Sequence, residues 1–216
     1  MSKKTEFESY KEMPIRPMTV DDMLWNETGS WRNVRPVYDF KISPCITGCP
    51  AGENVQKYIQ HVVDGEYREA WETIMENNPM PAVTGRVCFH PCLDKCVRRV
   101  FDEAINIIGI ERALGDMGLD NPGWLKKAKT GKKEKVAVVG SGPAGLSCAF
   151  YLARQGYPVT LFEADDALRG VLRWGIPEYR LPNSLLDRVV DSILSAGRIE
   201  VKTETPVGKE MKLKEL

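Results

Sequence analysis

The chain has 216 residues, which is enough for one large domain or two small ones. Its 30 basic residues balance 30 acidic residues, so no basic block points to nucleic acid as the main partner. Hydrophobic residues make up 43% of the chain, so we expect a folded protein. No apolar run approaches the length of a membrane span, so we expect no membrane-spanning segment. The N-terminus lacks the apolar stretch of a secretory signal, and we expect a cytoplasmic protein.

The first half of the chain has the apolar spacing of helices. Residues 1–40 are polar and irregular, which predicts an extended arm. Apolar residues at helical spacing over 53–63 and 66–76 predict a helical hairpin that turns at Gly65, and Asn78-Pro79 and Pro81 are expected to end its second helix. The next segment, 84–96, is expected to be rich in turns.

A further short helix is predicted over 105–116. Its buried side is expected to consist of Ile107, Ile108, Ile110, Ala113 and Leu114. A lysine-rich linker follows, and its composition predicts a domain boundary near 127–134. We therefore expect a helical domain over 41–126 and a second domain over 134–216.

After the linker the pattern changes to alternating strands and helices. The predicted strands are 135–139, 157–162 and 199–201, and the predicted helices are 143–156 and 183–196. This order is typical of a doubly wound α/β domain. Because such a domain needs more strands than these three, we expect the domain to be incomplete, with the rest supplied by a longer chain or by a partner chain.

Five of the six cysteines lie between positions 45 and 96, and the spacing Cys-x3-Cys occurs three times. Thiolates are soft ligands that suit iron–sulfur clusters or zinc. Zinc would prefer paired Cys-x2-Cys knuckles, so the spacing favours a cluster, with zinc as the alternative. The sixth cysteine, Cys148, stands apart and is expected to be a small core residue.

The segment VAVVGSGPAGLSCAFYLARQGYPVTLFEAD has the glycine fingerprint of a dinucleotide site. Gly140 permits a tight turn, Gly142 lets the backbone approach a pyrophosphate, and Gly145 lets helix and strand pack closely. Glu163 ends the second strand, where a carboxylate accepts hydrogen bonds from ribose hydroxyls. The alternative is a glycine-rich turn in an ordinary α/β domain.

The segment GSGPAGL…FEADDALRGVLRWGIPEYRLP resembles the FAD-binding start of the glutamate synthase small-subunit family, a module that dihydropyrimidine dehydrogenase also carries. The family pattern has a glycine where this chain has Arg169. The alternative for Arg180 is a surface salt bridge. The resemblance implies that FAD is bound by Gly140, Ser141, Gly142, Pro143, Ala144, Gly145, Glu163, Ala164, Arg169, Gly170, Val171, Arg180 and Val207.

Residues 44–116 resemble the helical [4Fe–4S] domain of the same family, through PCITGCPAGENVQKYI, NPMPAVTGRVCFHPCLDKC and DEAINIIGIERALGD. Mapped residue by residue, the resemblance implies a cluster held by Cys49, Cys88, Cys92 and Glu111. Members with two clusters carry further cysteines before the position of Cys45. Here that region has none, so a second cluster keeps only Cys45 and Cys96, and we expect one cluster unless a partner chain supplies ligands. Glu111 could instead be a solvated helix residue, and His90 is expected to shape the cysteine loop rather than to ligate.

The resemblance implies an electron-transfer module of an NAD(P)H-dependent FAD and iron–sulfur oxidoreductase that passes electrons to an acceptor protein. NAD(P)H would bind in a part of the protein that is absent from this chain. No side chain is an evident acid or base for substrate chemistry. The alternatives are a non-catalytic assembly subunit that carries a cluster, and a zinc-binding interaction module.

Overall fold

The computed structural model describes residues 42–127, 131–168, 170–208, 211–212 and 214. The chain divides into residues 1–40 and a compact unit from 41 to 216. The arm predicted over 1–40 lies outside the described residues, and so does Arg169.

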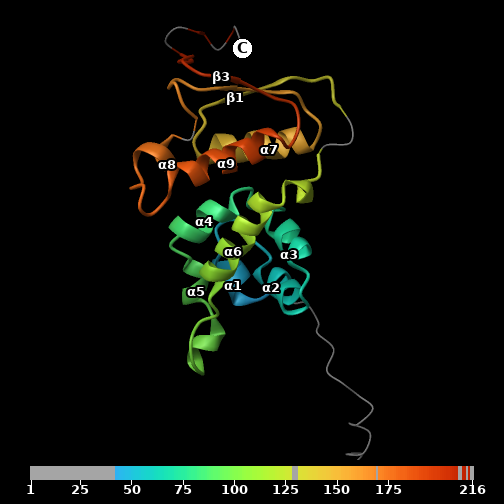
Figure 1. Cartoon of the computed structure of the whole chain (residues 1–216), viewed down its shortest axis with the longest axis vertical. Helices are drawn as coiled ribbons and strands as arrows, with labels where there is room; N and C mark the ends of the chain where they lie inside the picture. The colour runs from blue at the N-terminus through green and yellow to red at the C-terminus, as the bar shows by residue number, and fades with distance from the viewer. Residues whose placement is uncertain (1–41, 128–130, 169, 209–210, 213, 215–216) are drawn as a thin grey trace, which may run out of the picture. The chain divides into compact units, whose positions relative to one another are not determined.

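The first half of the compact unit is helical (Figure 1). Its elements are α1 (Pro44–Gly48), α2 (Val55–Val63), α3 (Tyr67–Ile74), α4 (Pro81–Val87), α5 (Pro91–Asp94), η4 (Val97–Val100), α6 (Ile107–Asp120) and η5 (Pro122–Trp124). The helices α2 and α3 form the predicted hairpin. Asn54 caps α2, because its side-chain oxygen accepts a hydrogen bond from the Lys57 amide at 3.1 Å.

The segment 84–96 contains more helix than the sequence predicted. Pro81 begins α4 instead of only ending the helix before it, since the missing amide of a proline costs nothing in the first turn of a helix. The helix α4 therefore runs to Val87, and α5 follows after a short turn at His90. Two cysteines are thereby placed at or near helix ends.

The helix α6 buries Ile107 and Leu114 as predicted, but its buried face differs from the prediction at Ala113. Ala113 is exposed, whereas Glu111 and Gly115 are buried with Leu114. A Cβ atom at Gly115 would lie only 2.2 Å from the Ala82 nitrogen, so α4 and α6 approach each other closely at that glycine. A helix face that includes glycines gives no apolar signal, which is why the predicted stripe was wrong at Ala113.

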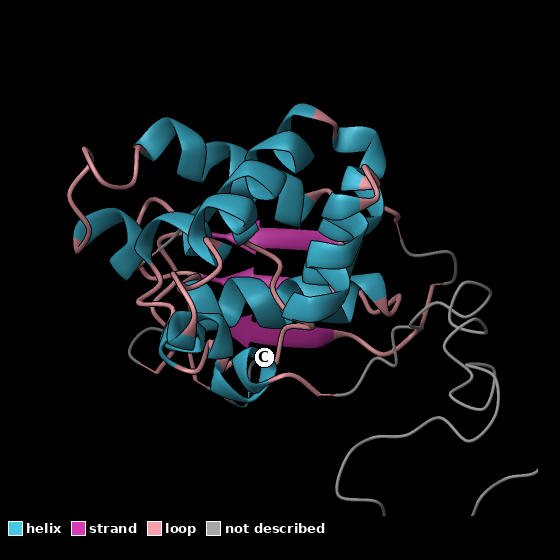
Figure 2. Ribbon diagram, turned by 90° about the horizontal axis from the view of Figure 1, so that it is seen from below, coloured by secondary structure: helices cyan, strands magenta, loops and turns pink. Residues whose placement is uncertain are grey.

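The second half contains β1 (Val136–Val139), α7 (Pro143–Arg154), β2 (Val159–Phe162), α8 (Val171–Trp174), α9 (Asn183–Leu194) and β3 (Ile199–Lys202). The strands form a parallel sheet in the order β1-β2-β3, with Val138 opposite Leu161 and Leu161 opposite Val201. The helices α7 and α9 lie side by side on one face of this sheet (Figures 1 and 2). The predicted fold class, a helical domain followed by a short Rossmann-type sheet, is confirmed.

The helix α7 turns a regular apolar stripe toward the core. Leu146, Ala149, Phe150 and Ala153 are buried, at the i, i+3, i+4 and i+7 spacing of one helix face. Cys148 falls outside this stripe and is exposed. The prediction that Cys148 is a core residue was therefore wrong.

The larger hydrophobic core joins the two halves of the compact unit. It contains residues of β2, α7 and α9, and it continues into the helical half through Trp71, Met75 and Met80. The Tyr151 hydroxyl also donates a hydrogen bond to the Met75 carbonyl at 3.3 Å. The domain boundary near 127–134 stays a prediction. In the part of the chain that is described, no helix has the length and apolar character needed to cross a membrane.

Candidate functional site

The glycine fingerprint forms a tight turn between β1 and α7. Gly140 follows β1 with φ of 92°, a backbone conformation that favours glycine. A Cβ atom at Gly145 would lie 1.8 Å from the Gly140 carbonyl oxygen, so the helix packs directly on the turn. A Cβ atom at Gly142 would meet nothing within 4 Å, which leaves open space beside the backbone there. The turn therefore fits a pyrophosphate.

Glu163 ties this turn to the end of β2. One carboxylate oxygen accepts hydrogen bonds from the Ser141 amide at 2.8 Å and from the Ser141 hydroxyl. The other accepts from the amides of Ala164 at 2.7 Å and Asp165 at 3.2 Å. Burial raises the pKa of Glu163, but the hydrogen bonds from Ser141, Asp165 and Ala164 outweigh it and hold the pKa below its ordinary value. Glu163 is thus a charged residue that fixes the turn.

Gly170 and Val171, which were also predicted to bind FAD, follow the fingerprint in the sequence, and Gly170 lies close to it in space. A Cβ atom at Gly170 would lie 3.2 Å from the Gly142 Cα atom, so these two glycines are neighbours. Val171 begins α8 and is 63% exposed. Arg180 is exposed and makes no ion pair with another described residue. Val207 is half-buried in the segment that follows Thr205, whose amide donates to the Glu163 carbonyl at 2.8 Å.

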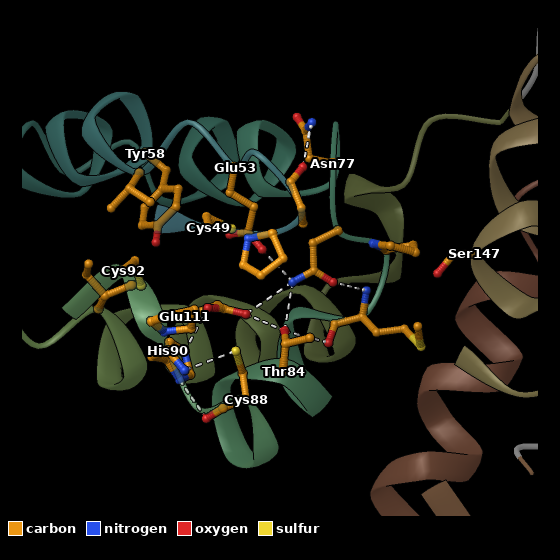
Figure 3. Close-up of a pocket in the computed structure, with 18 residues that line it drawn as sticks. Cys49, Glu53, Tyr58, Asn77, Thr84, Cys88, His90, Cys92, Glu111 and Ser147 are labelled. Carbon is orange, nitrogen blue, oxygen red and sulfur yellow. Dashed lines mark hydrogen bonds and ion pairs between the residues drawn. The ribbon is translucent and has the colours of Figure 1, made fainter. Parts of the chain in front are cut away.

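A cavity of about 250 Å³ lies in the helical half, and Ser147 of α7 also lines it (Figure 3). Cys49, Cys88, Cys92 and Glu111 all line it. These are the four residues that the resemblance assigns to one cluster. The lining includes neither Cys45, whose sulfur lies 2.9 Å from the Ser43 hydroxyl, nor Cys96, which precedes η4.

Short helices bring the three cysteines to this cavity. Cys49 is the C-cap of α1, Cys88 is the C-cap of α4, and Cys92 lies in α5. Between the last two, His90 adopts a left-handed conformation with φ of 49° and reverses the chain. Its amide donates to the Cys88 sulfur at 3.2 Å, and its Nδ1 atom lies 2.9 Å from the Cys88 carbonyl oxygen. His90 therefore shapes the cysteine loop, as predicted.

Glu111 lies in a buried polar network at the cavity wall (Figure 3). The Asn78 Nδ2 atom lies 3.1 Å from Glu111 Oε1, 2.9 Å from Glu53 Oε1 and 2.7 Å from the Thr84 hydroxyl. The Thr84 hydroxyl donates its single proton to Glu111. Glu111 is 4% exposed, so the alternative of a solvated helix residue is wrong.

His90 and Glu111 are in hydrogen-bonding contact. Because His90 Nδ1 faces a carbonyl oxygen, Nδ1 carries a hydrogen, and Nε2 lies 3.2 Å from Glu111 Oε2. That contact needs a proton on one of the two atoms. Burial lowers the pKa of His90, but its hydrogen bonds to Glu111 and to the Cys88 carbonyl outweigh burial and raise it. Burial, and then the charge of Glu111, raise the pKa of Glu53 to about 7.

The donor set of the cavity fits a [4Fe–4S] cluster. Three sulfurs and one carboxylate surround a space, and soft thiolates are the ligands that such clusters take. Burial, and then the neighbouring thiols of Cys49 and Cys88, raise the pKa of Cys92 to about 11. Among the described residues, no three His, Cys, Asp or Glu side chains lie close enough together to hold a single metal ion.

Sequence reasoning missed three residues of this cavity, Glu53, Asn78 and Thr84. All three lie in the segments that carry the resemblance, but Asn78 was interpreted only as part of a helix end. The hydrogen-bonded pairs Glu53–Asn78, Thr84–Glu111 and Asn78–Glu111 join residues that are 25 to 33 positions apart in the sequence. No local spacing in the sequence therefore reveals these contacts.

Comparisons with known proteins support both halves of the site. Residues 37–135 match the family model described as dihydropyrimidine dehydrogenase domain II, 4Fe-4S cluster. Residues 138–185 match the NAD(P)-binding Rossmann-like domain. The two matches assign a [4Fe–4S] domain to the helical half and a dinucleotide-binding domain to residues 138–185, in agreement with the two kinds of domain that were predicted.

Three curated relatives resemble most of the chain. The NADPH-Fe(3+) oxidoreductase subunit beta of Geobacter sulfurreducens is 40% identical over 85% of this chain and 28% of its own length. The NADP(+)-dependent formate dehydrogenase subunit beta of Moorella thermoacetica is 35% identical over 82% of this chain and 28% of its own. The glutamate synthase [NADPH] small chain of Bacillus subtilis is 38% identical over 81% of this chain and 36% of its own.

This chain thus spans about a third of the length of these relatives, or less. The predicted resemblance is confirmed, while the individual ligand and cofactor contacts stay predictions. Over most of its own length the chain is similar to part of the glutamate synthase small-chain-like iron–sulfur oxidoreductases.

Proposed function

We propose that this chain is the electron-transfer module of an NAD(P)H-dependent oxidoreductase that contains FAD and one [4Fe–4S] cluster. Bound FAD would accept electrons in pairs and release them one at a time, and a bound cluster would carry single electrons, which is the chemistry these groups supply. The NAD(P)H site and the electron acceptor belong, in this proposal, to the remainder of the protein or to a partner subunit.

The observation that carries the proposal is the place of α7 between the two candidate sites. The helix begins at Pro143, directly after Gly142 of the fingerprint turn. One turn later, Ser147 lines the same cavity as Cys49, Cys88 and Cys92 (Figure 3). Four residues of helix span about 6 Å along the axis. A dinucleotide whose pyrophosphate is bound at the turn would therefore lie near a cluster bound in the cavity, and this proximity supports electron transfer between the two groups.

The chain's own residues hold and orient the two groups. Cys49, Cys88 and Cys92 would ligate the cluster as thiolates, and Glu111 would supply the fourth ligand. Asn78 and Thr84 hold the Glu111 carboxylate in place through the hydrogen bonds given above. This is the supporting role that neighbours of a metal ligand commonly have.

The fingerprint turn would hold the pyrophosphate of FAD. The amides at the start of α7, and the positive end of its dipole, favour a phosphate charge. Glu163 keeps the turn in shape, and the open space at Gly142 admits the ligand.

The test is to isolate the whole chain without oxygen and reconstitute it with ferrous iron, sulfide and FAD. We expect about four irons per chain, bleaching of the cluster absorbance on reduction, and bound flavin. A cluster without flavin would contradict the proposal and favour the assembly subunit. Stoichiometric zinc with no uptake of iron would favour the interaction module.

A further inference from the structure

The Tyr58 hydroxyl is a buried polar group with no hydrogen-bond partner in the part of the chain that the structure describes. Tyr58 lies in α2 and is 0% exposed. Its ring belongs to the small core that also contains Val55, Ile74 and Leu114. Its hydroxyl oxygen is buried and has no hydrogen-bond partner among the described residues. Buried hydroxyls nearly always have a partner, so this one requires an explanation.

The hydroxyl faces the cluster cavity. Tyr58 lines the cavity together with Cys49 and Cys92, and Figure 3 shows its oxygen pointing into the space that these side chains border. Burial raises the pKa of Tyr58 most, followed by the charges of Glu53, Glu111, Cys92 and Cys49. The carboxylates of Glu53 and Glu111 and the thiolates of Cys49 and Cys92 all accept hydrogen bonds. Tyr58 is thus a donor placed among acceptors.

We propose that Tyr58 donates a hydrogen bond to a sulfur atom of the cluster site, either a sulfide or the thiolate of Cys49 or Cys92. This inference rests on the proposed function, because it requires a cluster in the cavity. A hydrogen bond to sulfur stabilises the more negative, reduced state, and it is one of the factors that set a cluster's reduction potential. Tyr58 would therefore raise that potential.

The variant Tyr58→Phe removes the oxygen and leaves the ring in the core. Tyr67→Phe is the matched control, since Tyr67 begins α3, is 47% exposed and does not line the cavity. Both whole chains are reconstituted with ferrous iron and sulfide and titrated against redox mediators. We expect equal iron content, a more negative midpoint potential for Tyr58→Phe, and a wild-type potential for the control. A Tyr58→Phe potential equal to that of wild type would overturn the proposal.

The proton couplings of the reduced cluster are a second readout, and this readout does not depend on a change in the reduction potential. The reduced cluster should show a coupled, exchangeable proton by electron–nuclear double resonance, which disappears in D₂O and in Tyr58→Phe. If every exchangeable proton coupling persists in Tyr58→Phe, the hydroxyl does not contact the cluster.

Thermal unfolding separates this role from a purely structural one. In the cluster-free chain the hydroxyl has no partner among the residues that the structure describes, so Tyr58→Phe should unfold at the wild-type temperature or above it. In the loaded chain the same variant should unfold, or lose iron, earlier than wild type. An equal loss of stability with and without the cluster would contradict the proposal. If wild-type protein takes up no cluster, the proposed function fails; if it does and the variants behave as wild type, only this inference fails.

Discussion

Asn78 Nδ2 lies 3.1 Å from Glu111 Oε1, and the orientation of the amide is fixed by the backbone. The Met80 amide donates to Asn78 Oδ1 at 2.9 Å, so the NH₂ group must face the carboxylates. A flipped amide would turn its oxygen toward Glu53 and Glu111 and leave the Met80 amide without its acceptor. Asn78 is 4% exposed, so its hydrogen bonds cannot readily be replaced by bulk water.

Asn78→Asp should therefore destabilise the cluster-free chain by about 3 kcal/mol, since it removes a buried donor and adds a carboxylate beside two others. Denaturant unfolding measures this loss. The control is Asn121→Asp, because Asn121 is exposed and its amide donates only to the Met117 carbonyl. If the two variants unfold at the same denaturant concentration, the amide does not hold the carboxylates together.

Two glycines of the fingerprint should respond differently to substitution. Gly142→Val places its side chain in open space, so it should fold with wild-type stability and retain the cluster, but lose FAD. Gly145→Ala would bring a Cβ atom against the Gly140 carbonyl oxygen and should cost about 2 kcal/mol of stability. Flavin content and denaturant unfolding distinguish the two effects. Wild-type flavin occupancy in Gly142→Val would show that the turn does not bind the dinucleotide.

Glu163 should make the stability of the cofactor-free chain depend on pH in the acid range. Its pKa is below the ordinary value in the folded state, so the unfolded chain binds the proton more readily. The stabilisation is then fully present above the unfolded pKa of about 4.3, and it is lost as the pH falls through the folded pKa.

The measurement is the free energy of unfolding of wild type and Glu163→Gln from neutral pH into the acid range. We expect wild type to be more stable at neutral pH and the difference to shrink as the pH falls below about 4.3. Glu178→Gln, at an exposed position, is the control. A difference between wild type and Glu163→Gln that stays constant with pH would mean that the charge of Glu163 does not stabilise the turn.

Features that depend on residues close together in the sequence could be predicted, whereas contacts between distant residues could not. The fingerprint is local, because Gly140, Gly142 and Gly145 lie within one turn, and its place between strand and helix was correctly predicted. The exposure of Cys148 was predictable in principle, since it lies outside the stripe of Leu146, Ala149, Phe150 and Ala153. The prediction failed because it considered only the apolar neighbours of Cys148 in sequence.

The polar part of the cluster cavity could not be found in this way. Asn78 contacts Glu53 and Glu111 across 25 and 33 residues. The pairing of α2 with α3 brings Glu53 toward Asn78, and the packing of α4 against α6 brings Glu111 there. That packing depends on Gly115, whose lack of a side chain gives no apolar signal. The resemblance supplied Glu111 as a candidate ligand, but not the groups that hold it.

The five clustered cysteines should fall into two classes. Cys49, Cys88 and Cys92 line one cavity with Glu111, whereas Cys45 and Cys96 do not. A cubane needs four ligands, so we expect about four irons in the isolated chain and not eight. Serine at Cys49, Cys88 or Cys92 should remove most of the iron and labile sulfide, because each variant leaves the cluster with too few thiolates.

Serine at Cys45 or Cys96 should leave most of the iron in place. Cys148→Ser is the matched control, since Cys148 is exposed on α7 and lies outside the cavity. The readout is iron and acid-labile sulfide per chain after anaerobic reconstitution. An equal loss of iron at Cys45 and Cys96 would show that the cavity does not define the ligand set. Close to eight irons per chain would instead show that these two cysteines help to hold a second cluster, with ligands from outside the cavity.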